Sequence, residues 1–138
     1  MTRTGPSKPV DKDYGNRRLA IAKAYLKAAQ DEATLADATS LGNPIASQIV
    51  KAAIAYADAI TAMRLGQVNQ RDHEGIHKLL RDALGNALPV AQARRLRRIV
   101  DSKDTVQYGV RLLRKDEAEQ LLSELQEFAR WAETELAR

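Results

Sequence analysis

Apolar residues recur at helical spacing in the first half of the chain and predict two long helices. Between residues 16 and 38, apolar residues are separated by three or four positions, as on one face of an α-helix. These residues are Leu19, Ala22, Leu26, Ala29, Ala33 and Ala36. A second stripe with this spacing lies between residues 41 and 66 and consists of Ile45, Ile49, Ala53, Tyr56, Ile60 and Met63. Asn43 is expected to cap the second helix, Pro44 to open it and Gly66 to end it.

The second half of the chain predicts three more helices. A short helix is expected from about residue 72 to 84, with Gly85 as its stop signal. Its apolar face comprises Ile76, Leu79, Leu80, Ala83 and Leu84. Pro89 opens the next predicted helix, which keeps the helical spacing to about Gly109. The last helix is expected from Lys115 onward, because the acidic residues in its first turns suit the helix dipole.

Five amphipathic helices with short connections predict an all-α fold, an antiparallel bundle of about five helices. Each helix has one apolar stripe to bury, so its neighbour must return beside it. No segment has the pattern of a convincing β-strand. We expect residues 1–14 to form a flexible N-terminal lead and residues 15–138 to form a single helical-bundle domain.

Composition narrows the class of protein. The chain has 138 residues and no cysteine, which excludes disulfides, thiolate zinc sites and cysteine nucleophiles. No apolar run approaches the roughly 20 residues that a membrane span needs, and the N-terminal residues lack the apolar core of a secretory signal. We therefore expect a cytoplasmic protein that does not contact a membrane.

The net charge of +4 makes an acidic partner such as RNA plausible. The stretch "ARRLRRIV" places Arg94, Arg95, Arg97 and Arg98 close together, and guanidinium groups suit phosphate contacts. These arginines are candidate RNA-binding residues. The alternative is an ordinary solvated helix face, because no aromatic residue lies among them to stack on a base.

Both histidines lie in "NQRDHEGIHKLL", residues 69–80. The letters "HEGIH" match H-E-x-x-H, in which two histidines one helical turn apart bind zinc and the glutamate activates a metal-bound water. The surroundings disfavour zinc, because a glycine between the ligands weakens the helix and no third ligand has a diagnostic spacing. We expect no metal and no cofactor, and we keep a zinc metalloprotease as a minor alternative.

Four segments, taken in order, resemble the HEPN superfamily of small α-helical bundles. They are "ASQIVKAAIAYADAITAMRLG", "DHEGIHKLL", "SKDTVQYG" and "DEAEQLLSELQEFARWAETEL", and the resemblance runs from about Ile45 to the end of the chain. It implies a homodimer in a toxin–antitoxin or RNA-directed defence setting. The implied activity is either metal-independent RNA cleavage or non-catalytic binding of an antitoxin or a nucleotidyltransferase-like partner.

In the RNA-cleaving form of this resemblance, His77 matches the catalytic histidine, Arg71 the phosphate-facing arginine and Asp72 the polar residue between them. A neutral imidazole can take the proton of a ribose 2′-hydroxyl while a guanidinium holds the phosphate. An ordinary helix start is the structural alternative. Asp72 would then cap the helix, and His77 would be a hydrogen-bonded surface residue.

The position of the motif departs from the resemblance. In many relatives the catalytic motif lies where this chain has "SKDTVQYG", and there the chain has Lys103, Asp104 and Tyr108 but no histidine. Tyrosine is a poor general base at neutral pH. These three residues therefore form either a partner-binding surface or a degenerate, inactive site.

Overall fold

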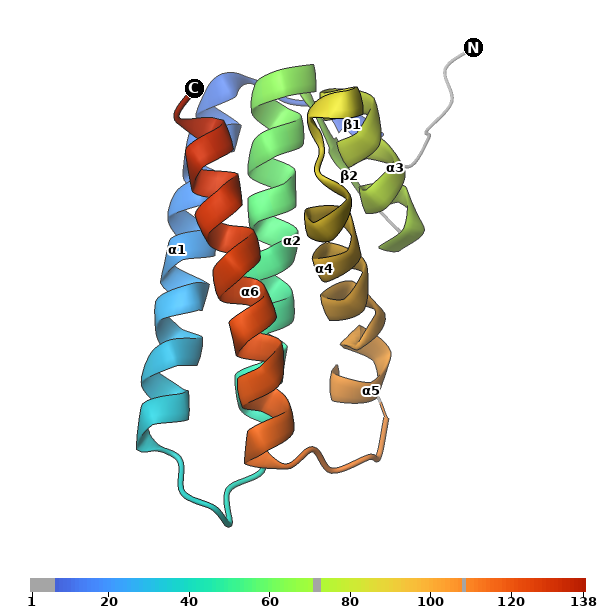
Figure 1. Cartoon of the computed structure of the whole chain (residues 1–138). Helices are drawn as coiled ribbons and strands as arrows, with labels where there is room; N and C mark the ends of the chain where they lie inside the picture. The colour runs from blue at the N-terminus through green and yellow to red at the C-terminus, as the bar shows by residue number, and fades with distance from the viewer. Residues whose placement is uncertain (1–6, 71–72, 108) are drawn as a thin grey trace.

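Two long antiparallel helices, α1 (Lys12–Leu35) and α2 (Asn43–Leu65), run the length of the bundle. The computed structural model describes residues 7–70, 73–107 and 109–138, without the side chains of His73 and Gln107. The long C-terminal helix α6 (Lys115–Leu136) packs against both α1 and α2 (Figure 1). The remaining helices are α3 (His73–Leu84), the short 3-10 turn η1 (Gly85–Ala87), α4 (Val90–Asp101) and α5 (Lys103–Gln107). The expected all-α bundle is confirmed.

Helix α2 lies at the centre of the bundle. Of its 23 residues, 14 are buried, and they are distributed around the helix instead of along one stripe. A helix that is apolar on all sides is buried on all sides, and α2 indeed contacts α1, α3, α4, α5 and α6. Its many alanines allow these neighbours to approach closely. The sequence predicted only one buried stripe on this helix.

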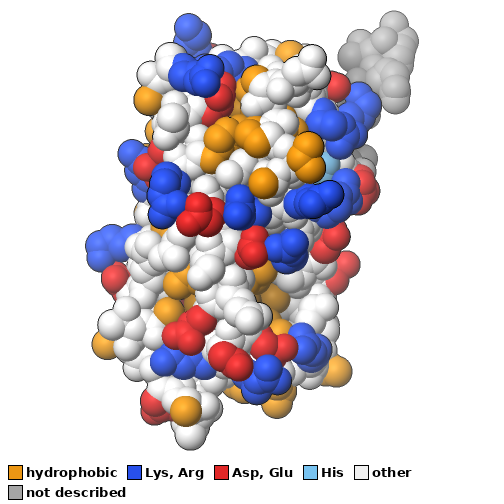
Figure 2. All heavy atoms as spheres, in the orientation of Figure 1, with side chains coloured by type: hydrophobic (Ala, Val, Ile, Leu, Met, Phe, Trp, Pro, Cys, Tyr) orange, Lys and Arg blue, Asp and Glu red, His pale blue; other side chains and the backbone are white. Residues whose placement is uncertain are grey.

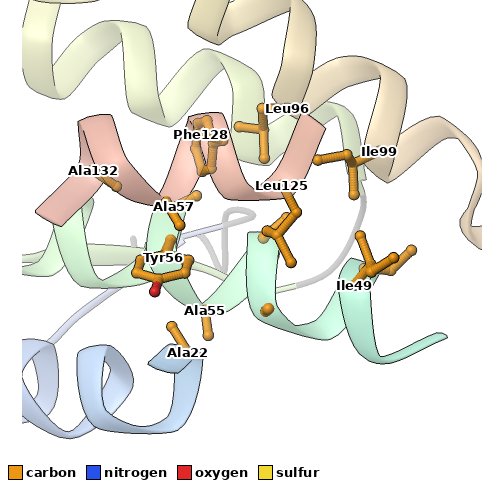
Figure 3. Close-up of a cluster of buried hydrophobic side chains, with 14 of the residues drawn as sticks. Ala22, Ile49, Ala55, Tyr56, Ala57, Leu96, Ile99, Leu125, Phe128 and Ala132 are labelled. Atoms are coloured by element: carbon orange, nitrogen blue, oxygen red, sulfur yellow. The ribbon is translucent and has the colours of Figure 1, made fainter. Parts of the chain in front are cut away.

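The core brings side chains from α2, α4 and α6 together. Figure 3 shows Tyr56 and Ile49 of α2 near Leu125 and Phe128 of α6, with Leu96 and Ile99 of α4 beside them. All six side chains are fully buried. On the opposite side, α1 contributes three buried alanines to this core, namely Ala22, Ala29 and Ala33.

The predicted fourth helix is divided into two. Helix α4 ends at Asp101, and α5 begins at Lys103. At the break, the Ser102 hydroxyl donates a hydrogen bond to the carbonyl of Ile99, at 2.6 Å. Serine side chains compete for helix carbonyls in this way. The prediction of one continuous helix to about Gly109 was therefore wrong.

A short antiparallel ribbon pairs β1 (Ser7–Pro9) with β2 (Gln67–Asn69), although no strand was predicted. Three residues per strand are too few to give an alternating pattern. The side chain of Asp11 caps α1 by accepting a hydrogen bond from the backbone N–H of Tyr14. The ribbon and the first turn of α1 thus lie partly within residues 1–14, the segment expected to be a flexible lead.

Asn43 has a different role from the predicted one. The N-cap of α2 is Gly42, and Asn43 is the first residue of the helix. The Oδ1 atom of Asn43 accepts a hydrogen bond from the backbone N–H of Leu113 at 2.8 Å, and its Nδ2 donates one to the carbonyl of Arg111 at 3.1 Å. Asn43 therefore joins the start of α2 to the segment that precedes α6. Within the described ranges, no helix is both long and apolar enough to cross a membrane.

Candidate functional site

His77, the histidine singled out from the sequence, is buried between α3 and α4. Its side chain belongs to the apolar face of α3, and the residue is only 6% exposed. The imidazole Nε2 atom is closed to solvent and has no hydrogen-bond partner among the described residues. The expectation of a hydrogen-bonded surface histidine was wrong, because α4 packs over the face of α3 that carries it.

A small pocket of about 40 Å³ adjoins His77. Its lining contains two arginines, Arg81 from α3 and Arg97 from α4, together with four apolar residues. The apolar residues are Leu80, Leu88, Ala93 and Leu96. A volume of this size is enough for water but not for a whole nucleotide. The sequence did not mark Arg81 as a site residue, although it lies four positions after His77 and so shares its helix face.

The surroundings of His77 favour the neutral imidazole. Burial is the main cause that lowers the pKa of His77, and the positive charge of Arg97 lowers the pKa further. The carboxylates of Glu74 and Asp101 oppose this effect, and Arg81 adds to it. The net result is a pKa below the ordinary value, so His77 is uncharged near neutral pH.

Glu74, the glutamate of "HEGIH", forms an ion pair across the two helices. The Nη1 atom of Arg97 donates to Glu74 Oε2 at 2.9 Å, and its Nη2 donates to Oε1 at 3.4 Å. This pair lowers the pKa of the Glu74 carboxyl, chiefly through the hydrogen bond. Among the described residues, no three histidine, cysteine or acidic side chains are grouped as a metal site would require.

The other two members of the predicted catalytic set, Arg71 and Asp72, lie outside the described residues. The same is true of Tyr108, and the side chain of His73 is also not described. The structure therefore does not test the arrangement of Arg71 and Asp72 around His77.

The four arginines of "ARRLRRIV" do not form an unpaired basic patch. Arg95 and Arg98 both pair with Glu124 of α6, at 3.3 and 2.8 Å, and Arg97 pairs with Glu74. In the described part of the chain, Arg94 is exposed and has no ion pair. Figure 2 shows Lys or Arg side chains next to Asp or Glu side chains across the middle of one face of the molecule.

Lys103 and Asp104, the two described residues of the possible degenerate site, begin α5. Lys103 is half-buried and Asp104 is exposed. The carbonyl of Asp104 accepts a hydrogen bond from the backbone N–H of Gly109, which closes the end of this helix. Helix α5 is held on α2 by Val106, whose side chain belongs to a small cluster with Ala46 and Leu113.

A second candidate site, which we name the loop groove, lies at the other end of the bundle. It is about 540 Å³ in volume and is lined by residues 38–41, 112–116 and 119. Gly42 allows its two sides to meet, because a Cβ atom at this position would lie 2.5 Å from the carbonyl oxygen of Arg114. The backbones of Leu41 and Arg114 also form a β-bridge.

Large apolar side chains are exposed around the loop groove. Leu41 and Leu112 line the groove and are 50% and 67% exposed, and Val110, two residues before Leu112, is 96% exposed. Val110 continues the apolar spacing of the predicted fourth helix, and Leu112 lies beyond it. The available signal for this surface was the presence of large apolar residues between two helices. Their spacing hid this signal, because it continued the predicted fourth helix past its actual end.

The two candidate sites lie at opposite ends of the molecule. Figure 1 shows α3 near the end where the strands β1 and β2 lie, whereas the α1–α2 and α5–α6 connections are at the other end. The loop groove is the larger of the two and is bordered by exposed apolar residues. Comparison with models of known protein families and with curated proteins finds no match to this chain.

Proposed function

We propose that this chain is a non-catalytic HEPN-type interaction module that binds a protein partner through the loop groove. The observation that carries this proposal is the exposure of Leu41 and Leu112, which line a groove of about 540 Å³. Isolated exposed apolar residues are common on proteins, but several at one end of a fold are typical of a surface that a partner covers.

The chemistry of the groove suits a protein partner. Its rim carries Arg114 and Lys115 together with Asp116 and Glu119, so both signs of charge surround the apolar side chains. An apolar centre with a polar, charged rim is the usual composition of a protein interface. The resemblance to HEPN proteins points to a nucleotidyltransferase-like partner or an antitoxin, and we place this complex in the cytoplasm.

The surroundings of His77 also favour binding over catalysis. A general base must come within hydrogen-bond reach of the proton that it removes. The Nε2 atom of His77 is closed to solvent, and the adjoining pocket of about 40 Å³ does not admit a ribose. The three residues at the usual motif position, Lys103, Asp104 and Tyr108, lack an efficient general base near neutral pH.

The proposal is tested by co-expression with the product of the neighbouring reading frame. Leu41→Ser and Leu112→Ser together should abolish co-purification, because they remove the two exposed apolar side chains that line the groove. Val90→Ser is the matched control, because Val90 is also 67% exposed but does not line the groove. A complex that survives the double substitution, or that Val90→Ser disrupts equally, would count against the loop groove as the docking surface.

RNA cleavage is a second candidate function. It is favoured by one observation, namely that a neutral imidazole adjoins two guanidinium groups, those of Arg81 and Arg97. If this candidate is correct, wild-type protein cleaves RNA in the presence of a chelator, and His77→Ala and Arg71→Ala each abolish cleavage. Cleavage that persists in both variants would remove His77 from the mechanism.

A further inference from the structure

The chain between α5 and α6 lies between two grooves. We name residues 110–113 the strap, and Figure 1 shows this connection crossing to α6 at one end of the bundle. One of the two grooves is the loop groove. The other has a volume of about 590 Å³ and is lined by residues of α4 and α6, and we name it the α4–α6 groove. Leu113 lines both grooves, so the strap forms part of the wall of each.

Three hydrogen bonds attach the strap to the start of α2. The side chain of Asn43 makes two of them, with the carbonyl of Arg111 and the backbone N–H of Leu113. The backbone N–H of Gly42 donates the third to the carbonyl of Leu113 at 2.8 Å. Among the described residues, the backbone of the strap makes no other hydrogen bond. One side chain, that of Asn43, therefore provides most of the polar attachment.

The apolar attachment of the strap is also small. Leu113 is the one buried residue of the strap, and the other three are exposed. Its side chain packs in a cluster with Ala46 and Val106, with Leu121 at the edge, and this cluster is separate from the main core. A segment that buries few apolar groups opens at a lower free energy than the whole domain.

We propose that the strap opens while the helical bundle stays folded, and that this opening joins the loop groove and the α4–α6 groove into one longer groove. Leu113 then leaves the wall of both grooves, and the cluster beneath it becomes accessible. The opening itself requires no partner. Its consequence for docking rests on the proposed function: the open form offers a partner a longer apolar surface than the loop groove alone.

Asn43 controls the opening, because its amide is both a donor and an acceptor for the strap. Asn43→Asp keeps an acceptor for the N–H of Leu113 but removes the donor to Arg111 and places a carboxylate near that carbonyl. A negative charge in the first turn of α2 suits the helix dipole, so the helix itself should not be weakened. The substitution should therefore act on the strap and not on the bundle.

The experiment uses the absence of cysteine from the chain. A single cysteine is introduced by Ala46→Cys beneath the strap, and its reaction with an aromatic disulfide reagent is timed. Ala57→Cys is the matched control, because Ala57 lies on the same helix and is equally buried but belongs to the main core. The Ala46→Cys thiol should react more than about tenfold faster, because local opening costs less free energy than global unfolding.

Denaturant and Asn43→Asp should affect the two thiols differently. Low concentrations of urea should accelerate the reaction of Ala57→Cys but hardly change that of Ala46→Cys, because local opening exposes little surface. Adding Asn43→Asp should accelerate the reaction of Ala46→Cys about fivefold, as the net loss of one hydrogen bond predicts, and leave that of Ala57→Cys nearly unchanged.

Hydrogen exchange of the Leu113 amide in the unsubstituted chain is a second measurement, which remains valid even where a cysteine prevents folding. This amide should exchange faster than that of Ile60 in α2. Equal rates and equal urea dependence at the two amides, or at the two thiols, would overturn the proposal, because the strap would then open only with the bundle. The test replaces neither Leu41 nor Leu112 and needs no partner, so opening of the strap and the proposed partner binding succeed or fail separately.

Discussion

The Nη2 atom of Arg18 lies 3.3 Å from Oδ2 of Asp58, and this ion pair joins α1 to α2 inside the bundle. Asp58 is only 7% exposed. Burial raises the pKa of its carboxyl to about 6, although the charge of Arg18 and its hydrogen bond act in the opposite direction. The folded protein therefore binds a proton at Asp58 more readily than the unfolded chain does.

This difference predicts how stability depends on pH. Because the folded pKa is the higher one, the stabilising contribution is fully present below about pH 4 and is lost as pH rises through about 6. One pKa unit corresponds to about 1.4 kcal/mol, so the contribution is on the order of 3 kcal/mol. Chemical unfolding of wild type and Asp58→Asn between pH 4 and 7 measures it.

Wild type should lose stability relative to Asp58→Asn across this interval, because only wild type releases the proton. Comparison of the two proteins removes the effect of the other carboxyl groups. Asp37→Asn is a useful control, because hydrogen bonds from Thr39 lower the pKa of this exposed carboxyl. Parallel pH profiles for wild type and Asp58→Asn would show that Asp58 titrates normally.

Glu124 is expected to limit any binding of RNA. Its carboxylate pairs with both Arg95 and Arg98. Glu124→Gln should therefore increase RNA affinity and make its salt dependence steeper, because each additional arginine that contacts a phosphate adds about 0.9 to the slope. Filter binding over a range of salt concentrations checks this, with Glu119→Gln as control, since Glu119 of the same helix pairs with Lys115 instead. Equal slopes for all three proteins would remove Arg95 and Arg98 from RNA binding.

The oligomeric state is a separate test of the HEPN resemblance. We expect a homodimer at tens of micromolar, an order of magnitude suited to weak self-association. Light scattering coupled to size-exclusion chromatography measures the mass directly. A monomer at this concentration would eliminate an RNA-cleaving site shared between two copies, but it would leave the proposed binding of a different partner intact.

Zinc content tests the metalloprotease interpretation of "HEGIH". We expect purified protein to contain no stoichiometric zinc and a chelator to leave its melting temperature unchanged, because Glu74 is engaged by Arg97 and His77 is buried. Elemental analysis and thermal unfolding provide the measurements. Tight zinc binding that both His73→Ala and His77→Ala abolish would instead establish a metal site.

The sequence predicted the helices well where each one has a stripe of apolar residues. Helix α6 begins at Lys115 as expected, and α2 ends before Gly66 as expected. The break at Ser102 was missed because one serine that bonds to a carbonyl within its own helix leaves the apolar spacing unchanged. Helical spacing therefore predicts that a helix is present better than it predicts where the helix is interrupted.

The candidate sites were harder to predict than the fold. The burial of His77 depends on how α4 packs over α3, and the neutralisation of Arg95 depends on Glu124 of a later helix. Both depend on contacts between residues that are far apart in the sequence. The spacing of neighbouring residues does not predict such contacts. The exposed side chains of Val110 and Leu112 could be recognised only after the end of α5 was known.

The central position of α2 determines which unfolding events expose its backbone amides. A backbone amide in the middle of this helix is covered by neighbours on every side, so no single peripheral helix can expose it by moving away. Its hydrogen exchange should require unfolding of the whole bundle, whereas amides of the short helix α5 should exchange through local opening. Exchange rates at Ile49 and Ile60 would then report the global free energy of unfolding, and those of α5 would be faster and less sensitive to denaturant.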